Sequence, residues 1–166
     1  MTDRAAASVD ALERRKRHLP HWEAPGEAYF ITFCLARPPA VDLTEARFAS
    51  LVVAALCHFD GSRYILYDYV VMPDHVHCIL QPTVADGRTE PLSRIMQSLK
   101  GWLARQINAA AGRSGKLWQT ETYDHLLRNV ADYEEKSAYI LDNPFRSGLV
   151  QQGAEWAWCG RGSGVV

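Results

Sequence analysis

The sequence predicts an α+β fold, a ferredoxin-like split βαβ sandwich with an antiparallel sheet and an additional C-terminal helix that carries a tyrosine. Strand-type and amphipathic helical runs alternate in the order β-α-β-β-α-β, and a final helical run follows. The chain has 166 residues, of which 48% are hydrophobic. Such a chain has enough apolar side chains for the core of one domain.

The first elements are an arm, a strand and a helix. Residues 1–25 are polar and predict a mobile N-terminal arm, and residues 26–159 predict a single domain. The aromatic and β-branched run 29–35 predicts a strand. Thr44 is a suitable cap for a helix whose apolar positions recur up to residue 59, before a glycine.

The middle of the chain predicts a hairpin and a long helix. The runs 64–72 and 75–81 are rich in strand-forming residues and are separated by Pro73-Asp74, which favours a turn. A loop over 83–90 then leads to Pro91, a good first helical residue. The helix that follows has a regular apolar face, and we expect Trp102 to lie in the core.

The last third predicts a strand and a helix. The strand lies within 117–127. The helix has Asp132 as N-cap with Glu135 three residues later, and Pro144 is expected to stop it. The run Trp156-Ala157-Trp158-Cys159 is expected to pack on the domain, whereas 160–166 predicts a disordered tail.

Overall composition argues against several classes of protein. Eighteen basic and 19 acidic residues give a net charge of -1 and a pI of about 6.6, so any nucleic-acid surface must be local. The four cysteines form no CxxC pair, which argues against a zinc knuckle or a disulfide framework. No apolar run is long enough for a membrane span or a signal peptide, and we expect a cytoplasmic protein.

His75 and His77 form the first candidate site. Side chains two apart on a strand point to the same side, so the two imidazoles project together. Paired imidazoles are a natural half of a metal site. The spacing alone leaves open that both are structural histidines.

Tyr139 and Asn143 form the second candidate site. They are four residues apart near the end of the last helix and share one face. Because Asn143 precedes a proline, we expect it to be the last helical residue, with its side-chain oxygen available as a ligand. The alternative is a buried aromatic residue and a helix cap.

Together, these motifs resemble the HUH single-tyrosine transposases, and among them the REP-associated tyrosine transposases of bacteria. The resemblance covers residues 28–159. It is carried by Tyr29-Phe30-Ile31-Thr32, Tyr69-Val70-Val71-Met72-Pro73-Asp74-His75-Val76-His77, Lys100, Trp118-Gln119, Tyr123-Asp124-His125, and Tyr139-Ile140-Leu141-Asp142-Asn143-Pro144 with Gly148-Leu149-Val150.

The resemblance implies a role for each candidate residue. His75, His77 and Asn143 would hold a divalent metal, Mg²⁺ or Mn²⁺, and Tyr139 would be the nucleophile that forms a 5′-phosphotyrosine. The implied partner is single-stranded DNA with REP-like hairpins, bound by a monomer or a homodimer. Residues suited to contact DNA are Arg14, Arg15, Lys16, Arg17, Arg94, Lys100, Arg105 and Trp118.

Two other functions are compatible with the same residues. One is a protein derived from a transposase that binds nucleic-acid hairpins without cutting them. The other is a hydrolase in which His75 and His77 activate water and no covalent adduct forms. The presence of all the implied catalytic residues favours the transposase.

Overall fold

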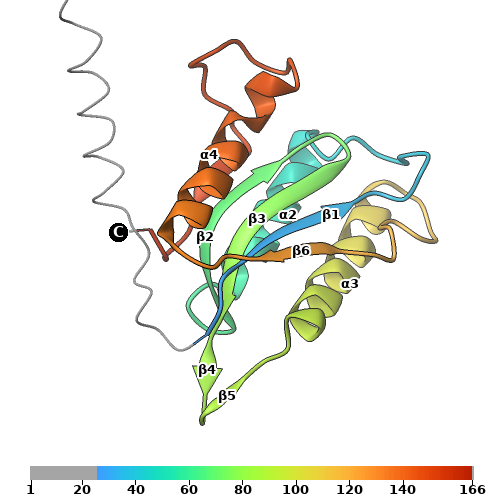
Figure 1. The fold of residues 1–166 in the computed structure, drawn as a ribbon. Helices are drawn as coiled ribbons and strands as arrows, with labels where there is room; N and C mark the ends of the chain where they lie inside the picture. Colours follow the sequence, from blue (N-terminus) through green and yellow to red (C-terminus); the bar gives the residue numbers. More distant parts are fainter. Residues whose placement is uncertain (1–25, 166) are drawn as a thin grey trace, which may run out of the picture.

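The computed structural model describes residues 26–165, which form a five-stranded antiparallel sheet with helices on both faces (Figure 1). The helices are α2 (Ala46–His58), α3 (Leu92–Ala110) and α4 (Val130–Arg146); the strands are β1 (Tyr29–Cys34), β2 (Tyr64–Val71), β3 (His75–Pro82), β4 (Val84–Ala85), β5 (Arg88–Thr89), β6 (Tyr123–Leu126) and β7 (Cys159–Arg161). The strand order is β6-β1-β3-β2-β7. Without the edge strand β7, this is the split βαβ arrangement, so the predicted ferredoxin-like fold is confirmed.

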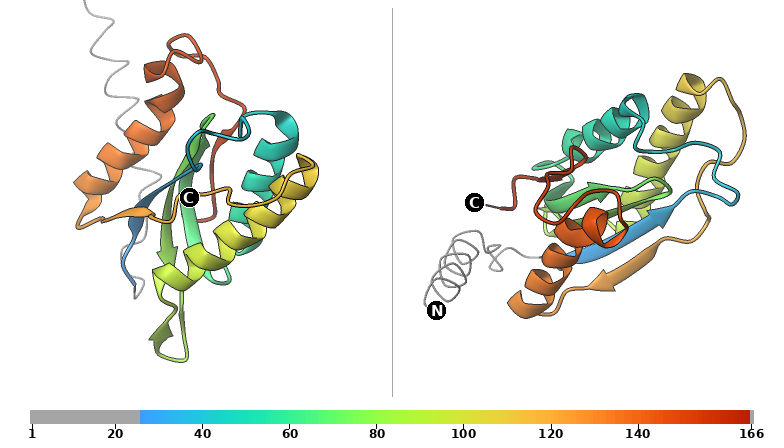
Figure 2. Two further views of the ribbon diagram at one scale, coloured as in Figure 1. Left: turned by 90° about the vertical axis from the view of Figure 1, so that its right-hand side faces the viewer. Right: turned by 90° about the horizontal axis from the view of Figure 1, so that it is seen from above.

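The helices form two layers. Figure 2 shows α2 and α3 on one side of the sheet and α4 on the other. Side chains of β3 alternate between these layers, because successive residues of a strand face opposite ways. Val76 and Cys78 are fully buried in the core beneath α2 and α3, whereas Ile79 lies in the core beneath α4. The same alternation turns His75 and His77 toward the α4 layer.

The helices α2 and α3 follow the apolar spacing of the sequence, but one predicted cap is wrong. The Thr44 amide and hydroxyl both donate to Asp42 Oδ1, and α2 begins at Ala46 after Glu45, without a side-chain cap. Pro91 is the residue before the first turn of α3. Its fixed φ suits the start of a helix, and it lacks a backbone N–H that would need a partner.

The predicted loop 83–90 contains a short hairpin, β4–β5, that projects beyond the sheet (Figure 1). Its turn residues Asp86 and Gly87 have φ values of 51° and 71°. Asp-Gly is a favoured pair for the type I′ turn, which needs positive φ at both positions. The Asp86-Gly87 dipeptide therefore explains a hairpin in a segment that was predicted to be a loop.

Helix α4 is longer than predicted at both ends. Its N-cap is Asn129, whose side chain accepts from the Asp132 amide at 2.9 Å, so Asp132 is not the cap. Pro144 lies inside the helix, which continues to Arg146. The predicted stop at Pro144, with Asn143 as the last helical residue, was therefore wrong.

The end of α4 is a Schellman motif. The Gly148 amide donates to Phe145 O and the Leu149 amide to Pro144 O, each at 2.9 Å. Gly148 has a φ of 72°, a conformation that glycine adopts without steric cost. The glycine thus ends the helix four residues beyond the proline that was expected to stop it.

The predicted disordered tail 160–166 is ordered over the part that the structure describes, to residue 165. Strand β7 pairs with β2, and the Gly162 amide donates to Tyr67 O at 2.7 Å. Arg161 Nε donates to Asp68 Oδ1 at 3.2 Å, and Asp68 is fully buried. The glycine-rich composition was misleading, because a free edge of β2 and a buried carboxylate both gain partners from this segment.

The packing expected of the tryptophan segment is present. The Trp156 indole N–H donates to Val71 O at 3.0 Å, and Trp158 packs against the larger core.

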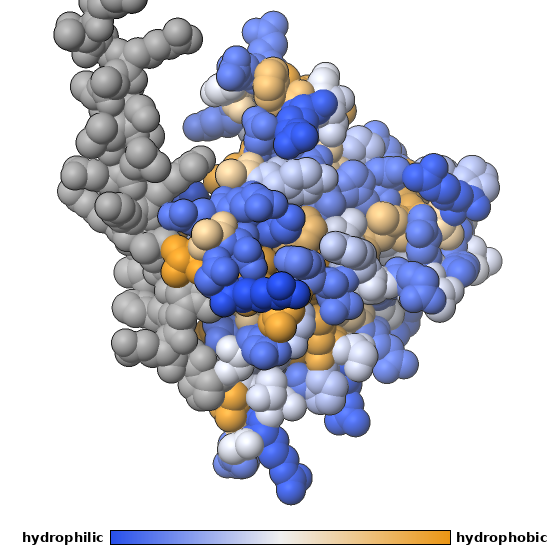
Figure 3. All heavy atoms as spheres, in the orientation of Figure 1, coloured by the Kyte–Doolittle hydropathy of each residue, from blue (hydrophilic) through white to orange (hydrophobic). Residues whose placement is uncertain are grey.

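The predicted arm 1–25 lies outside the described residues. Figure 3 shows a mostly polar face with apolar side chains in small groups. No helix within residues 26–165 is long and apolar enough to cross a membrane.

Candidate active site

The two histidines lie side by side on β3, on the α4 side of the sheet. Their ring centroids are 4.6 Å apart, with 71° between the ring planes. The neighbouring strand β1 runs antiparallel, with Thr32 opposite His77 and Cys34 opposite His75. A central strand fixed on both edges holds the two imidazoles on a rigid support.

Tyr139 of α4 lies against this pair. The centroid of its ring is 5.3 Å from that of His77, and 5.9 Å from that of Phe30 on β1. The tyrosine is 36% exposed, whereas His77 is 5% exposed. The helix therefore brings a solvent-accessible phenol onto a buried imidazole from a distant part of the sequence.

Hydrogen bonds engage the same nitrogen of each imidazole. Thr32 Oγ1 lies 2.7 Å from His77 Nδ1, and Asp74 Oδ1 lies 2.7 Å from His75 Nδ1. Such contacts fix ring orientation and direct Nε2 toward a ligand. Neither Thr32 nor Asp74 was singled out from the sequence as part of the site, although both occur within the quoted motifs.

The Nε2 atom of His77 is a buried polar atom without a hydrogen bond in the described part of the chain. Burial, together with the neighbouring His75, lowers the pKa of His77 to about 3, so the ring is neutral. A neutral imidazole with an unpaired, buried nitrogen has the donor state that metal coordination requires.

Asn143 lies one helical turn beyond Tyr139 and is 5% exposed. Its side-chain oxygen accepts from Ser147 Oγ at 3.4 Å, and no hydrogen bond among the described residues joins it to either histidine. Residues 26–165 contain no cluster of three or more His, Cys, Asp or Glu side chains suited to a metal. The two histidines are thus a pair of donors, and Asn143 stays a predicted third ligand.

The residues of α3 predicted to contact DNA lie on the other layer. Arg94 and Arg105 are exposed there, as is Trp102 at 38%, contrary to its expected place in the core. Lys100 directs its ammonium group at Gln119 O, Thr120 O and Thr122 Oγ1. These three acceptors occupy all three donors of Lys100, which fixes the loop before β6 onto α3.

Trp118 does not offer a face for base stacking. It is 5% exposed, its indole N–H donates to Lys100 O at 3.0 Å, and its ring packs edge-on against Phe33 at 5.0 Å. Trp118 thus packs as a core side chain, which does not support its predicted DNA contact. The basic run Arg14, Arg15, Lys16 and Arg17 lies outside the described residues.

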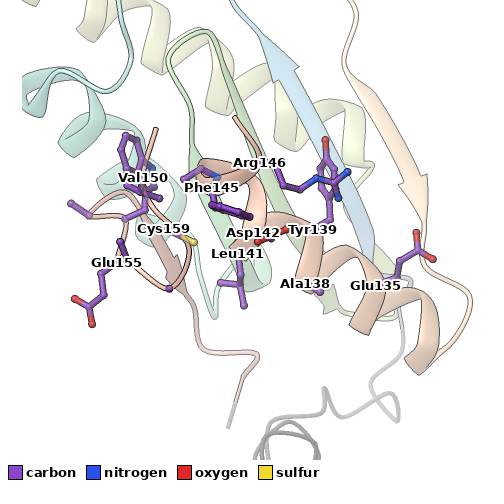
Figure 4. Close-up of a pocket in the computed structure, with 15 residues that line it drawn as sticks. Glu135, Ala138, Tyr139, Leu141, Asp142, Phe145, Arg146, Val150, Glu155 and Cys159 are labelled. Atoms are coloured by element: carbon purple, nitrogen blue, oxygen red, sulfur yellow. The ribbon is translucent and has the colours of Figure 1, made fainter. Parts of the chain in front are cut away.

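A groove of about 1060 Å³ runs along α4 between Tyr139 and the segment 150–159 (Figure 4). Arg146 lines it, with its Cζ atom 5.6 Å from the Tyr139 ring centroid. Arg146 was not predicted as a site residue, because Pro144 was expected to end the helix before it. Gly148 was the signal that could have extended the helix to include it.

The sequence and the fold are similar to those of known transposases. The family model described as "Transposase IS200 like" matches residues 46–142. A REP-associated tyrosine transposase of Escherichia coli (strain K12) is 33% identical over 88 residues, which are 53% of this chain and 48% of that protein. A Haemophilus influenzae protein provisionally given the same name is 24% identical over 94 residues, 53% of each chain. The chain thus matches about half the length of these curated relatives.

A solved structure is also similar. It is that of a REP-associated tyrosine transposase bound to a REP hairpin, with a TM-score of 0.64, 25% sequence identity, and coverage of 86% of this chain and 78% of that one. The family model spans more than half of the chain, including β3 with its two histidines and the part of α4 up to Asp142, which contains Tyr139. The chain belongs to the IS200-like transposase family.

Proposed function

We propose that this protein cleaves and rejoins single-stranded DNA with Tyr139 as nucleophile, in a reaction that depends on a divalent metal. One observation supports this most strongly: the exposed Tyr139 ring lies 5.3 Å from His77, whose buried Nε2 has no partner among residues 26–165. The ring nitrogens of a purely structural buried histidine are usually both hydrogen-bonded.

The donor set fits a metal. His75 and His77 would hold it through Nε2, since Thr32 and Asp74 occupy Nδ1, and the Asn143 amide oxygen is the proposed third ligand. Nitrogen and oxygen donors suit several divalent ions, and Mg²⁺ or Mn²⁺ is the proposal taken from the family. When bound, such an ion supplies positive charge that polarises a phosphate group and stabilises charge on its oxygens.

The chemistry of the chain's own residues is a phosphodiester exchange. The Tyr139 oxygen attacks phosphorus as its proton is lost, the bond from phosphorus to the 3′-oxygen breaks, and that oxygen takes up a proton. One phosphodiester is replaced by another, so no nucleotide hydrolysis is needed. Attack by a 3′-hydroxyl on the 5′-phosphotyrosine reverses the step and joins strands.

The proposed substrate is single-stranded DNA that carries a hairpin. The similar solved structure holds a REP hairpin, and this supports the same class of partner here. Two residues predicted to contact the hairpin, Lys100 and Trp118, are engaged within the protein. Arg94 and Arg105 stay candidates for DNA contact on the layer of α3.

Adduct formation tests the proposal. The protein is incubated with Mn²⁺ and a pool of single-stranded hairpin oligonucleotides, and denaturing electrophoresis detects covalently bound DNA. We expect an adduct with the wild type and none with Tyr139→Phe. The control is Tyr123→Phe, because Tyr123 is 59% exposed on β6 opposite Thr32 and is the alternative phenol on this part of the sheet.

Other results would contradict the proposal in different ways. An adduct that persists in Tyr139→Phe and disappears in Tyr123→Phe would assign the wrong nucleophile. Hairpin binding by the wild type without any adduct would support a non-catalytic binding protein instead. Cleavage without an adduct would support water as the nucleophile.

A further inference from the structure

Arg146 lies on the same face of α4 as Tyr139, two turns later. Seven residues of an α-helix rotate the side chain by about 700°, or roughly 20° from full register. The Arg146 guanidinium carbon is 5.6 Å from the centroid of the Tyr139 ring. Figure 4 shows the two side chains extending to the same end of the groove. This placement exists only because α4 continues through Pro144.

Arg146 has no ionic partner, unlike other arginines of the structure. Arg63 pairs with Glu90, and Arg161 with the buried Asp68. Arg146 is exposed and makes no ion pair or hydrogen bond within residues 26–165. A guanidinium beside a reactive phenol, left without a carboxylate, is available for an anion.

The charges around the groove limit where that anion can bind. Three carboxylates line the groove: Glu135, Asp142 and Glu155. Arg146 is the one cation among the described residues that line it. Asp142 lies within one helical turn of both Tyr139 and Arg146, so the Arg146 guanidinium is what can attract a phosphate to this part of the groove.

We infer that Arg146 binds the phosphate group that Tyr139 attacks and then carries. The inference rests on the proposed function. A guanidinium presents parallel N–H donors that match two phosphate oxygens, which a lysine ammonium cannot reproduce. Arg146 thereby orients the scissile phosphate toward the phenol and stabilises charge that develops on its oxygens.

A purely structural role of Arg146 would give different experimental results. Arg146 is in the last turn of α4, where any cation interacts favourably with the helix dipole. That role is served equally by lysine, and its loss changes thermal stability without changing the rate of adduct formation. Arg146→Lys therefore separates the two roles, since it keeps the charge and removes the planar pair of donors.

The experiment measures single-turnover adduct formation with Mn²⁺ and oligonucleotides that the wild type cleaves. We expect Arg146→Gln to be about 100-fold slower and Arg146→Lys to be at least about tenfold slower. Thermal melting confirms folding. The matched control is Arg128→Gln, an exposed arginine just before the opposite end of α4, whose rate should equal that of the wild type.

A second measurement requires neither metal nor cleavage. In EDTA, the affinity for a short single-stranded oligonucleotide with a 5′-phosphate is compared with that for the same oligonucleotide with a 5′-hydroxyl. The wild type and Arg128→Gln should prefer the 5′-phosphate, and Arg146→Gln should lose that preference.

Each contrary outcome has a distinct meaning. If the wild type forms no adduct, the proposed function fails and this inference fails with it. If the wild type reacts and Arg146→Gln reacts equally fast, only the inference on Arg146 is overturned. An unchanged rate for Arg146→Lys would overturn the paired phosphate contact and leave helix-end charge as the role of Arg146.

Discussion

At the scale of single residues, the candidate site depends on side chains that hold the histidines in place. Thr32 and Asp74 contact Nδ1 of the two imidazoles, and His77 Nε2 is left buried and unpaired within the described residues. Contacts of this kind set both the orientation of a ligand and its protonation. Two predictions follow from His77 and its partner.

Removal of the Thr32 hydroxyl should weaken metal binding. Thr32→Val keeps the size of the side chain but deletes the contact with His77 Nδ1, and we expect the dissociation constant for Mn²⁺ to rise about 10- to 100-fold. Calorimetric titration measures it. Thr122→Val is the control, because Thr122 bonds to Lys100 instead. Equal affinities for wild type and Thr32→Val would show that the Thr32 contact does not support metal binding by His77.

The pKa of His77 predicts a pH dependence of stability. It is lowered to about 3 in the folded protein, from an ordinary value of 6.5. Between these values the unfolded chain binds a proton that the folded chain does not, so the free energy of unfolding falls as the pH falls from 6.5 toward 3. We expect His77 to contribute up to about 1 kcal/mol per pH unit across that window.

Denaturant unfolding in EDTA, for wild type and His77→Gln, isolates this contribution. Carboxylates titrate in both proteins, so their contributions cancel in the difference between the two free energies of unfolding. The wild type should lose stability relative to the variant as the pH decreases. Parallel curves for the two proteins between pH 6.5 and pH 4 would contradict the lowered pKa of His77.

At the scale of elements, the decisive feature is where α4 ends. The helix passes Pro144 and closes at Gly148 with a Schellman motif, and this extension places Arg146 on the face of Tyr139. A proline removes one amide donor near the helix end, where few bonds remain to be lost. Position 148, by contrast, requires a glycine because its φ is positive.

Gly148→Ala should therefore destabilise the protein. A Cβ at this position would meet no atom within 4 Å, so the cost is the backbone conformation alone, about 1–2 kcal/mol in the free energy of unfolding. Gly101→Ala in α3 is a control of opposite sign, because alanine favours an ordinary helical position by about 1 kcal/mol. Urea denaturation compares both with the wild type. A neutral Gly148→Ala would refute the helix end described here.

At the scale of the whole molecule, one buried carboxylate joins α4, the sheet and the C-terminal edge strand. The buried Asp68 of β2 accepts from Tyr133 of α4 at 2.8 Å and from Arg161 of β7 at 3.2 Å. Burial and the nearby Asp68 raise the pKa of Tyr133, which keeps its hydroxyl protonated as a donor. The position of α4 on the sheet, and so of Tyr139 over His77, depends on this carboxylate.

Loss of the Arg161 charge should weaken the fold. We expect Arg161→Gln to lower the free energy of unfolding by about 1–3 kcal/mol, since Asp68 stays buried with one partner fewer. Arg47→Gln is the control, because its ion pair with Glu45 is exposed, and it should cost less than about 1 kcal/mol. Denaturation by guanidinium measures the free energy of unfolding of both variants. Equal effects of the two substitutions would mean that Asp68 does not need Arg161.

The sequence by itself determined the order of the main elements, because the strand-forming residues of 64–72 and 75–81 and the helical period in 92–107 leave little choice of structure. It also determined that His75 and His77 share one face, since strand alternation is local geometry. The pairing of side chains distant in sequence is not local. Only the tertiary structure decided that Tyr139 contacts His77, that Trp118 is buried, and that residues 159–161 form an edge strand. Those outcomes depend on which surfaces meet when the sheet and helices pack, and on which buried polar groups then need partners.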